Sequence, residues 1–274
     1  MHAINLKIDA DFLRSQMGHA SVICQDGWNF YFKVSLFGQF DKVFFSEAQF
    51  FDHFWVGAVF REVVKFHNVF FNECATFYES LFEDLVSFRK VIFENGANFT
   101  RSEFDGEAHF EIESKIEEIE LKNELKRKEI NFEGSEFTKK SDFELRNLDV
   151  FQLSFEGCKF CGEFLLQSEN STIRFLNLQS TVFSEIARFV PYSYYNHKKL
   201  VRDIKVEYTA FMKSAIFEID FEKCPDFSKC YFLEKVFIKE TWPEVIEKKV
   251  RPYEKEKFLF LKSYYTKSNI YTLN

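Results

Sequence analysis

The Phe residues between positions 60 and 110 recur in a strict alternation of six- and five-residue steps. The ten positions are Phe60, Phe66, Phe71, Phe77, Phe82, Phe88, Phe93, Phe99, Phe104 and Phe110. A small or β-branched residue, such as Ala75 or Val86, stands two positions before each of them. One longer and one shorter step together make the repeat, and each step supplies one large and one small apolar side chain.

Neither of the common secondary structures explains this repeat. An α-helix spreads positions five or six apart over different sides, and a single long strand alternates every second residue. Short extended pieces separated by tight turns do fit, because each piece can turn its Phe and its small residue inward. Four such pieces, which amount to two repeats, close one coil, so the sequence predicts an all-β solenoid. In it the ten Phe side chains form the core, and rings four steps apart, such as Phe60 and Phe82, stack on one another.

Units such as Ala75-Thr76-Phe77-Tyr78-Glu79 resemble the pentapeptide-repeat family, in particular the Phe-centred subgroup that alternates five- and six-residue units. The resemblance is clean over residues 40–110 and looser over 131–189. Stepping backwards by five, it also places Trp55, Phe50, Phe45 and Phe40 at inward positions. It implies a right-handed quadrilateral β-helix.

The repeat is interrupted in ways that predict the organisation of the chain. Residues 111–130 have no Gly or Pro and place Ile112, Ile116 and Ile119 on one helical face, which favours a helical insertion. A degenerate coil is the alternative, because Phe132 returns on schedule. The expected segments are an N-terminal cap at 1–39, regular coils at 40–110, a helical insertion at 111–130, less regular coils at 131–240 with an insertion near 192–210, and a C-terminal helical cap at 241–274.

No combination of residues predicts catalysis or metal binding. Cys158 and Cys161 form a CxxC pair, but a zinc site needs a second pair at suitable spacing, and Cys158 occupies an inward small position. The six His residues show no grouping typical of a metal site or a catalytic triad, and His67 and His109 are expected to point outward. We therefore expect a protein that is not an enzyme and that uses no metal and no cofactor.

The sharpest functional signal is a set of acidic residues that follow the Phe60, Phe82 and Phe104 column. Glu62, Glu83, Asp84 and Asp105 are expected to form an acidic ridge, and residues 40–110 carry a formal net charge of −6. A solvated wall is the simpler interpretation. The resemblance offers another, since quinolone-resistance members of the family bind type II topoisomerase in place of DNA. Acidic coils also disfavour nucleic acid as a partner.

The leading hypothesis is a non-enzymatic β-helical scaffold for protein–protein interaction, with an unknown protein partner, or the soluble part of a membrane-associated assembly. The alternative is the acidic DNA mimic that binds type II topoisomerase. The N-terminus lacks the apolar run of a secretory signal, no stretch reaches membrane-span length, and the six Cys residues are thinly spread. These features predict a cytoplasmic chain that does not insert into a membrane. A homodimer through the C-terminal region is left open.

Overall fold

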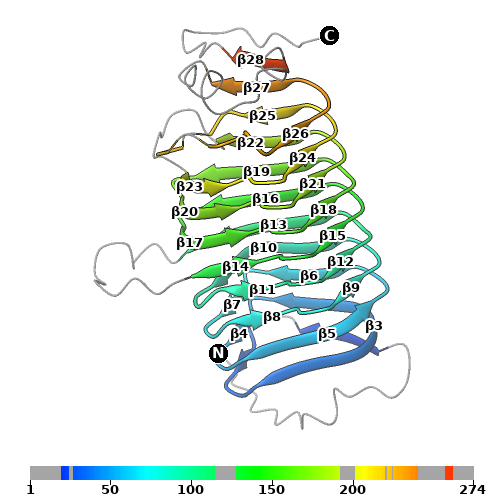
Figure 1. Cartoon of the computed structure of the whole chain (residues 1–274). Coiled ribbons are helices and arrows are strands. Elements are labelled where there is room, and N and C mark those ends of the chain that lie inside the picture. The colour runs from blue at the N-terminus through cyan, green and yellow to red at the C-terminus, as the bar shows by residue number, and fades with distance from the viewer. Residues whose placement is uncertain are drawn as a thin grey trace, which may run out of the picture.

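The computed structural model describes residues 20–24, 27–114, 128–191, 201–219, 221–223, 225–239 and 257–261. Their strands stack as parallel coils along one long axis, from the N-terminal coil to the C-terminal coil (Figure 1). Over these residues the stack has about eight turns and almost no helix. The predicted all-β solenoid is thereby confirmed.

Each regular coil has four faces, which we number by the column of side chains that each contributes to the core. Face 1 contains β9 (Leu81–Phe82), β12 (Glu103–Phe104), β15 (Glu136–Phe137), β18 (Lys159–Phe160), β21 (Val182–Phe183), β24 (Ala210–Phe211) and β26 (Tyr231–Phe232). Face 2 contains β1 (Ala20–Cys24), β6 (Val64–His67), β10 (Val86–Phe93), β13 (Ala108–Glu113), β16 (Ser141–Arg146), β19 (Phe164–Glu169), β22 (Ala187–Pro191), β25 (Ala215–Phe217), β27 (Val236–Lys239) and β28 (Phe258–Leu261).

Faces 3 and 4 complete the coil. Face 3 contains β2 (Asn29–Phe30), β4 (Gln49–Phe50) and β7 (Phe70–Phe71), and the end of β10 pairs with β7 there. Face 4 contains β8 (Ala75–Thr76), β11 (Ala97–Asn98), β14 (Glu129–Asn131), β17 (Asp149–Ser154), β20 (Thr172–Asn177) and β23 (Val201–Lys205). Two longer strands, β3 (Val34–Ser46) and β5 (Phe54–Phe60), run from one face to the next in the first coils without a corner between them.

Stacked aromatic rings fill the interior. The ten Phe residues of the regular repeat are all at most 1% exposed. The longest column lies on face 1, with ring centroids 4.5–5.8 Å apart, and consists of Phe40, Phe60, Phe82, Phe104, Phe137, Phe160, Phe183, Phe211 and Phe232. This separation follows from the strand spacing of about 4.8 Å and lies in the range that aromatic pairs favour. Each buried Phe contributes roughly 1.5–3 kcal/mol, so the columns dominate the stability of the fold.

Two of the corners turn through a residue with positive φ. In the regular coils these residues are Asn68, Glu79, Lys90 and Arg101, one in each repeat, with φ between 52° and 57°. Some tight turns need a residue with φ > 0 at their third position. The repeat therefore sets the positions of the turns as well as those of the core side chains.

A line of small side chains two positions before the face 1 rings joins one coil to the next. Each donates a hydrogen bond to a main-chain carbonyl, at 2.5–3.5 Å: Ser80, Ser102, Ser135, Cys158, Thr181, Thr209 and Cys230. Buried polar atoms need hydrogen-bond partners, and the main-chain carbonyls supply them here. This line therefore accommodates Ser, Thr and Cys, whereas most of the other small positions hold Ala or Val.

The coil that contains residues 111–130 is longer than the rest. Phe99 stacks on Phe132 and Phe110 stacks on Phe143, so rings that are neighbours in these columns are six steps apart in the sequence instead of four. The two extra steps equal half a regular coil, which is why Phe132 keeps the rhythm although it does not stack above Phe110. The predicted helix falls largely on residues 115–127, which lie outside the described residues. Its edges differ from the expectation, since 111–113 belong to β13 and 129–130 to β14.

Four other expectations need correction. Strands begin within the predicted 1–39 cap, at β1, because its residues already alternate and pair with β3. Part of the predicted insertion near 192–210 is strand, since β23 pairs with β20; residues 192–200 lie outside the described residues. In the predicted C-terminal helical cap, β28 is a strand paired with β27, and the rest of the cap lies outside the described residues. Trp55 is 45% exposed, and Phe54 takes the inward position, because β5 runs on without a corner.

Candidate functional site: the outward faces of the coil stack

The acidic ridge lies at the corner between face 1 and face 2. Glu62, Glu83, Asp84 and Asp105 are all exposed. They rise from successive coils, since the Glu83 amide donates to the Phe60 carbonyl and the Asp105 amide to the Phe82 carbonyl, both at 2.8 Å. The four acidic side chains therefore lie at the same corner of three successive coils.

The ridge is short and bounded by positive charge. Lys42, in the coil before it, pairs with Glu62 at 3.1 Å. In the coil after it, the Thr138 amide donates to the Phe104 carbonyl, and Lys139 and Lys140 follow at the same corner. No ion pair among the described residues involves Glu83, Asp84 or Asp105. The unneutralised charge therefore occupies two coils rather than the length of the solenoid.

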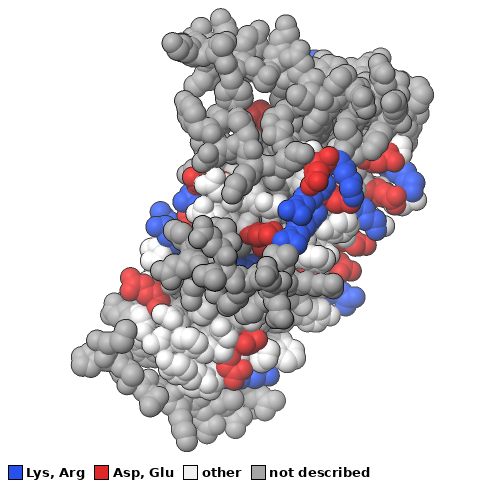
Figure 2. All heavy atoms as spheres, turned by 90° about the vertical axis from the view of Figure 1, so that its left-hand side faces the viewer, with Lys and Arg blue, Asp and Glu red and all other residues white. Residues whose placement is uncertain are grey.

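Elsewhere, cations and anions of neighbouring coils pair across the strands. Arg174 makes two hydrogen bonds to Asp149, at 2.7 and 3.2 Å, and Lys159 lies 2.6 Å from Glu136. The Lys159 contact lowers the pKa of Glu136. Figure 2 shows the same alternation on one side of the molecule, where Lys, Arg, Asp and Glu lie beside one another instead of gathering by sign. Each such pair adds little to the stability of the fold. Together, however, the pairs leave a surface with little net electrostatic potential.

The two CxxC cysteines differ in burial and in hydrogen-bond partner. Cys158 is buried and donates to the Phe132 carbonyl at 2.9 Å, while Cys161 lies on the outer corner 3.6 Å from Glu136. Burial raises the pKa of both thiols, which opposes formation of the reactive thiolate. Among the described residues no group of three or more His, Cys, Asp or Glu could hold a metal ion.

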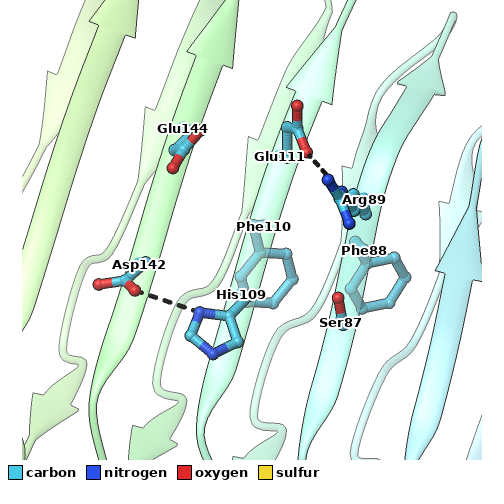
Figure 3. A pocket seen from close by; sticks show the side chains of 8 residues that line it. All are labelled: Ser87, Phe88, Arg89, His109, Phe110, Glu111, Asp142 and Glu144. Carbon is cyan, nitrogen blue, oxygen red and sulfur yellow. Dashed lines mark hydrogen bonds and ion pairs between the residues drawn. The ribbon is translucent and has the colours of Figure 1, made fainter. Parts of the chain in front are cut away.

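A hollow of about 230 Å³ opens on face 2, where β10, β13 and β16 lie side by side (Figure 3). Ser87, His109 and Asp142 are consecutive partners in the strand register, and they line the hollow with Arg89, Glu111 and Glu144. Within the hollow, the small Ser87 side chain stands beside the larger His109.

The order Ser, His, Asp resembles a nucleophilic triad, but the geometry does not support one. The His109 ring directs Nδ1 to Asp142 Oδ2 at 3.1 Å and Nε2 to Glu107 Oε2 at 3.3 Å. In Figure 3 both ring nitrogens face away from Ser87. A general base must reach the proton that it removes, so this arrangement does not activate the Ser87 hydroxyl.

Apolar side chains are exposed on and beside face 1 of the C-terminal coils. Tyr208 is 62% exposed, Tyr231 is 46% and Leu233 is 51%. Val182, Ala210 and Tyr231 are consecutive partners on the outward side of this face. Met212 and Leu233 follow at the adjoining corner, in successive coils. We call the following set the apolar strip: Val182, Ala210, Met212, Tyr208, Tyr231 and Leu233.

The sequence analysis missed the apolar strip and the His109 contacts for the same reason. Both depend on which outward residues are brought together, and that depends on coil length. Rings of the face 1 column are 22 positions apart from Phe60 to Phe104, but 28 apart between Phe183 and Phe211. The signal that would have found the strip is the residue directly before each inward ring, which points outward. Ala210 precedes Phe211 in this way, and Tyr231 precedes Phe232.

No helix among the described residues has the length and apolarity needed to cross a membrane. Comparison with curated proteins and with solved structures gave no match. A family model of pentapeptide repeats, in nine copies, matches residues 56–103. That segment forms the regular coils from β5 to β12, and the coils on either side repeat its architecture. Residues 56–103 thus carry pentapeptide repeats, and the four-sided stack of coils is consistent with a pentapeptide-repeat β-helix.

Proposed function

We propose that this β-helix is a non-enzymatic scaffold for protein–protein interaction, and that the apolar strip is its principal contact surface. The observation that carries the proposal is the exposure of Tyr208, Tyr231 and Leu233 in coils whose adjacent charged residues are paired with one another. Exposed apolar groups rimmed by polar residues mark interaction sites, and Tyr and Met are enriched in such interfaces.

The geometry of the strip suits this role. Val182, Ala210 and Tyr231 stand on strands whose inward neighbours, Phe183, Phe211 and Phe232, are stacked and buried, so this part of the surface is rigid before a partner arrives. The rim consists of ion pairs, Glu207 with Lys229 and Lys213 with Glu234. A preorganised surface loses little side-chain entropy on binding, which favours affinity.

A reducing compartment suits the scaffold, because the described cysteines, Cys24, Cys74, Cys158, Cys161 and Cys230, are free thiols. We therefore propose that the scaffold acts in the cytoplasm. Its partner could belong to a membrane-associated assembly or be a second copy bound through the C-terminal coils, where the strip lies.

The test compares the wild type with two surface variants by proximity labelling in the host cell. One variant replaces Tyr231 and Leu233 by Ser, and the matched control replaces Glu83 by Gln and Asp84 by Asn. We expect a labelled protein that is lost with the strip variant and retained with the control, and that binds the purified wild type directly. Identical labelling by all three proteins contradicts the proposal.

The unpaired acids Glu83, Asp84 and Asp105 favour one alternative, a DNA mimic that binds type II topoisomerase. The ridge spans too few coils for that role, because a mimic needs negative charge along a rod. We expect no inhibition of gyrase supercoiling at micromolar protein. Salt-sensitive inhibition that disappears when Glu83 and Asp84 are replaced by Lys would support the mimic and overturn the scaffold proposal.

A further inference from the structure

His109 is held between two carboxylates that belong to different coils. Its Nδ1 lies 3.1 Å from Asp142 Oδ2, on the next coil, and its Nε2 lies 3.3 Å from Glu107 Oε2, just before its own strand. A neutral imidazole carries one N–H, and an ionised carboxylate can only accept. Both contacts are therefore hydrogen bonds only when the ring carries two protons and a positive charge.

The groups around the ring are predominantly acidic. On its own strand and the turn before it stand Glu107 and Glu111, and β16 contributes Asp142 and Glu144. Three cations face this cluster. Arg89 on β10 lies 3.5 Å from Glu111, and Arg146 on β16 lies 2.9 Å from both Glu111 and Glu144. Lys140 shares Asp142 Oδ2 with the ring, at 2.8 Å, and so offsets part of the charge of Asp142, while Glu107 contacts the ring from the other side.

The position of the contact gives it a structural consequence. His109 on β13 and Asp142 on β16 join the coil that precedes residues 115–127 to the coil that follows them. The ring is partly buried, with 36% of its side chain exposed, and the Asp142 side chain is 16% exposed. A charged pair at this depth is screened less than one in open solvent.

We propose that His109 is a proton-dependent clamp that holds β13 against β16 when its imidazole is charged and releases part of that contact when the ring becomes neutral. This inference is independent of the scaffold proposal, because it concerns the junction of two coils on face 2 and not the apolar strip.

The direction of the pH effect follows from the contacts. The hydrogen bond to Asp142 raises the pKa of His109 above its ordinary value, and partial burial opposes this effect. Burial alone would raise the pKa of Asp142, but the hydrogen bonds from His109 and Lys140 lower it. A group whose pKa is raised by folding stabilises the fold below its unfolded pKa, about 6.5 for His. The clamp is thus complete at pH 6 and is lost as the pH rises through the raised pKa of His109.

The first test is an NMR titration of the His109 ring in the full chain. We expect a pKa above about 6.5 in the wild type and a lower one in the Asp142→Asn variant, which removes the partner's charge. A wild-type pKa at or below the ordinary value, or one unchanged by Asp142→Asn, would overturn the proposal.

The second test is native-state amide exchange of Phe143 and Glu144, with each variant compared to the wild type at the same pH. We expect His109→Gln to accelerate exchange about threefold at pH 6, the scale of an exposed ion pair, and to have little effect at pH 9. His67→Gln is the matched control, since among the described residues no hydrogen bond or ion pair involves the His67 ring, which is also on face 2. Equal acceleration at both pH values, or acceleration by His67→Gln as well, would show a merely structural role.

Discussion

Truncation of one ring in the face 1 column should destabilise the solenoid more than its area alone implies. Phe82 is 1% exposed, and its ring centroid lies 4.9 Å from that of Phe60 and 5.0 Å from that of Phe104. The strand that carries it is paired on both sides, with β5 and with β12, so the neighbouring coils cannot move together to fill the space. The cavity therefore persists, and Phe82→Ala should cost about 3–5 kcal/mol, as buried Phe truncations do.

Two variants at and beside this position isolate the cause. Glu83→Ala changes the adjacent exposed residue and should cost less than about 0.5 kcal/mol. Phe82→Leu should cost less than about 1.5 kcal/mol, because Leu166 already occupies a ring position on face 2, in register with Phe143. The assay is urea unfolding followed by circular dichroism, with equal slopes required before midpoints are compared. Equal losses for Phe82→Ala and Glu83→Ala would refute the assignment of inward and outward positions.

Two further predictions concern the small residues of the coil. Cys158→Ser keeps a donor to the Phe132 carbonyl and should be nearly neutral, whereas Cys158→Ala loses that hydrogen bond and should cost about 1 kcal/mol in the same unfolding assay. Equal effects would show that the thiol only fills space. Gly106→Ala would place a Cβ 2.2 Å from the main-chain carbon of Asp84, so we expect a loss of about 2 kcal/mol or more. Gly57→Ala, whose Cβ would meet the Phe37 ring at 3.4 Å, should cost far less, and the reverse order in melting temperature would contradict the close approach of the coils at Gly106.

The regular core could be predicted from sequence because its constraint is local. Every step of the repeat must bury one ring and one small residue, so the positions of Phe77, Phe82 and Phe88 follow from the steps alone. The same rule fails where a strand runs on without a corner. In β5 the burial alternates through Phe54, Val56, Ala58 and Phe60, which leaves Trp55 outside although it stands five positions before Phe60.

The vertical neighbours could not be predicted because the repeat looks the same after every two steps, whereas a coil closes only after four. A coil lengthened by one repeat keeps the rhythm of Phe and small residues but shifts every later residue by half a turn. Phe132 therefore stacks on Phe99, and His109 finds Asp142. Neither the clamp nor the apolar strip has a signal in the spacing itself.

The pairing of strands across this lengthened coil can be measured directly in solution. Interstrand nuclear Overhauser contacts between main-chain protons report which residues are neighbours in a parallel ladder. We expect His109 to contact the Asp142–Phe143 segment and Asn98 to contact Asn131, because those pairs are in register. Contacts between His109 and Asn131, which stand four steps apart in the repeat, would instead show a coil of regular length and would contradict the stacking described here.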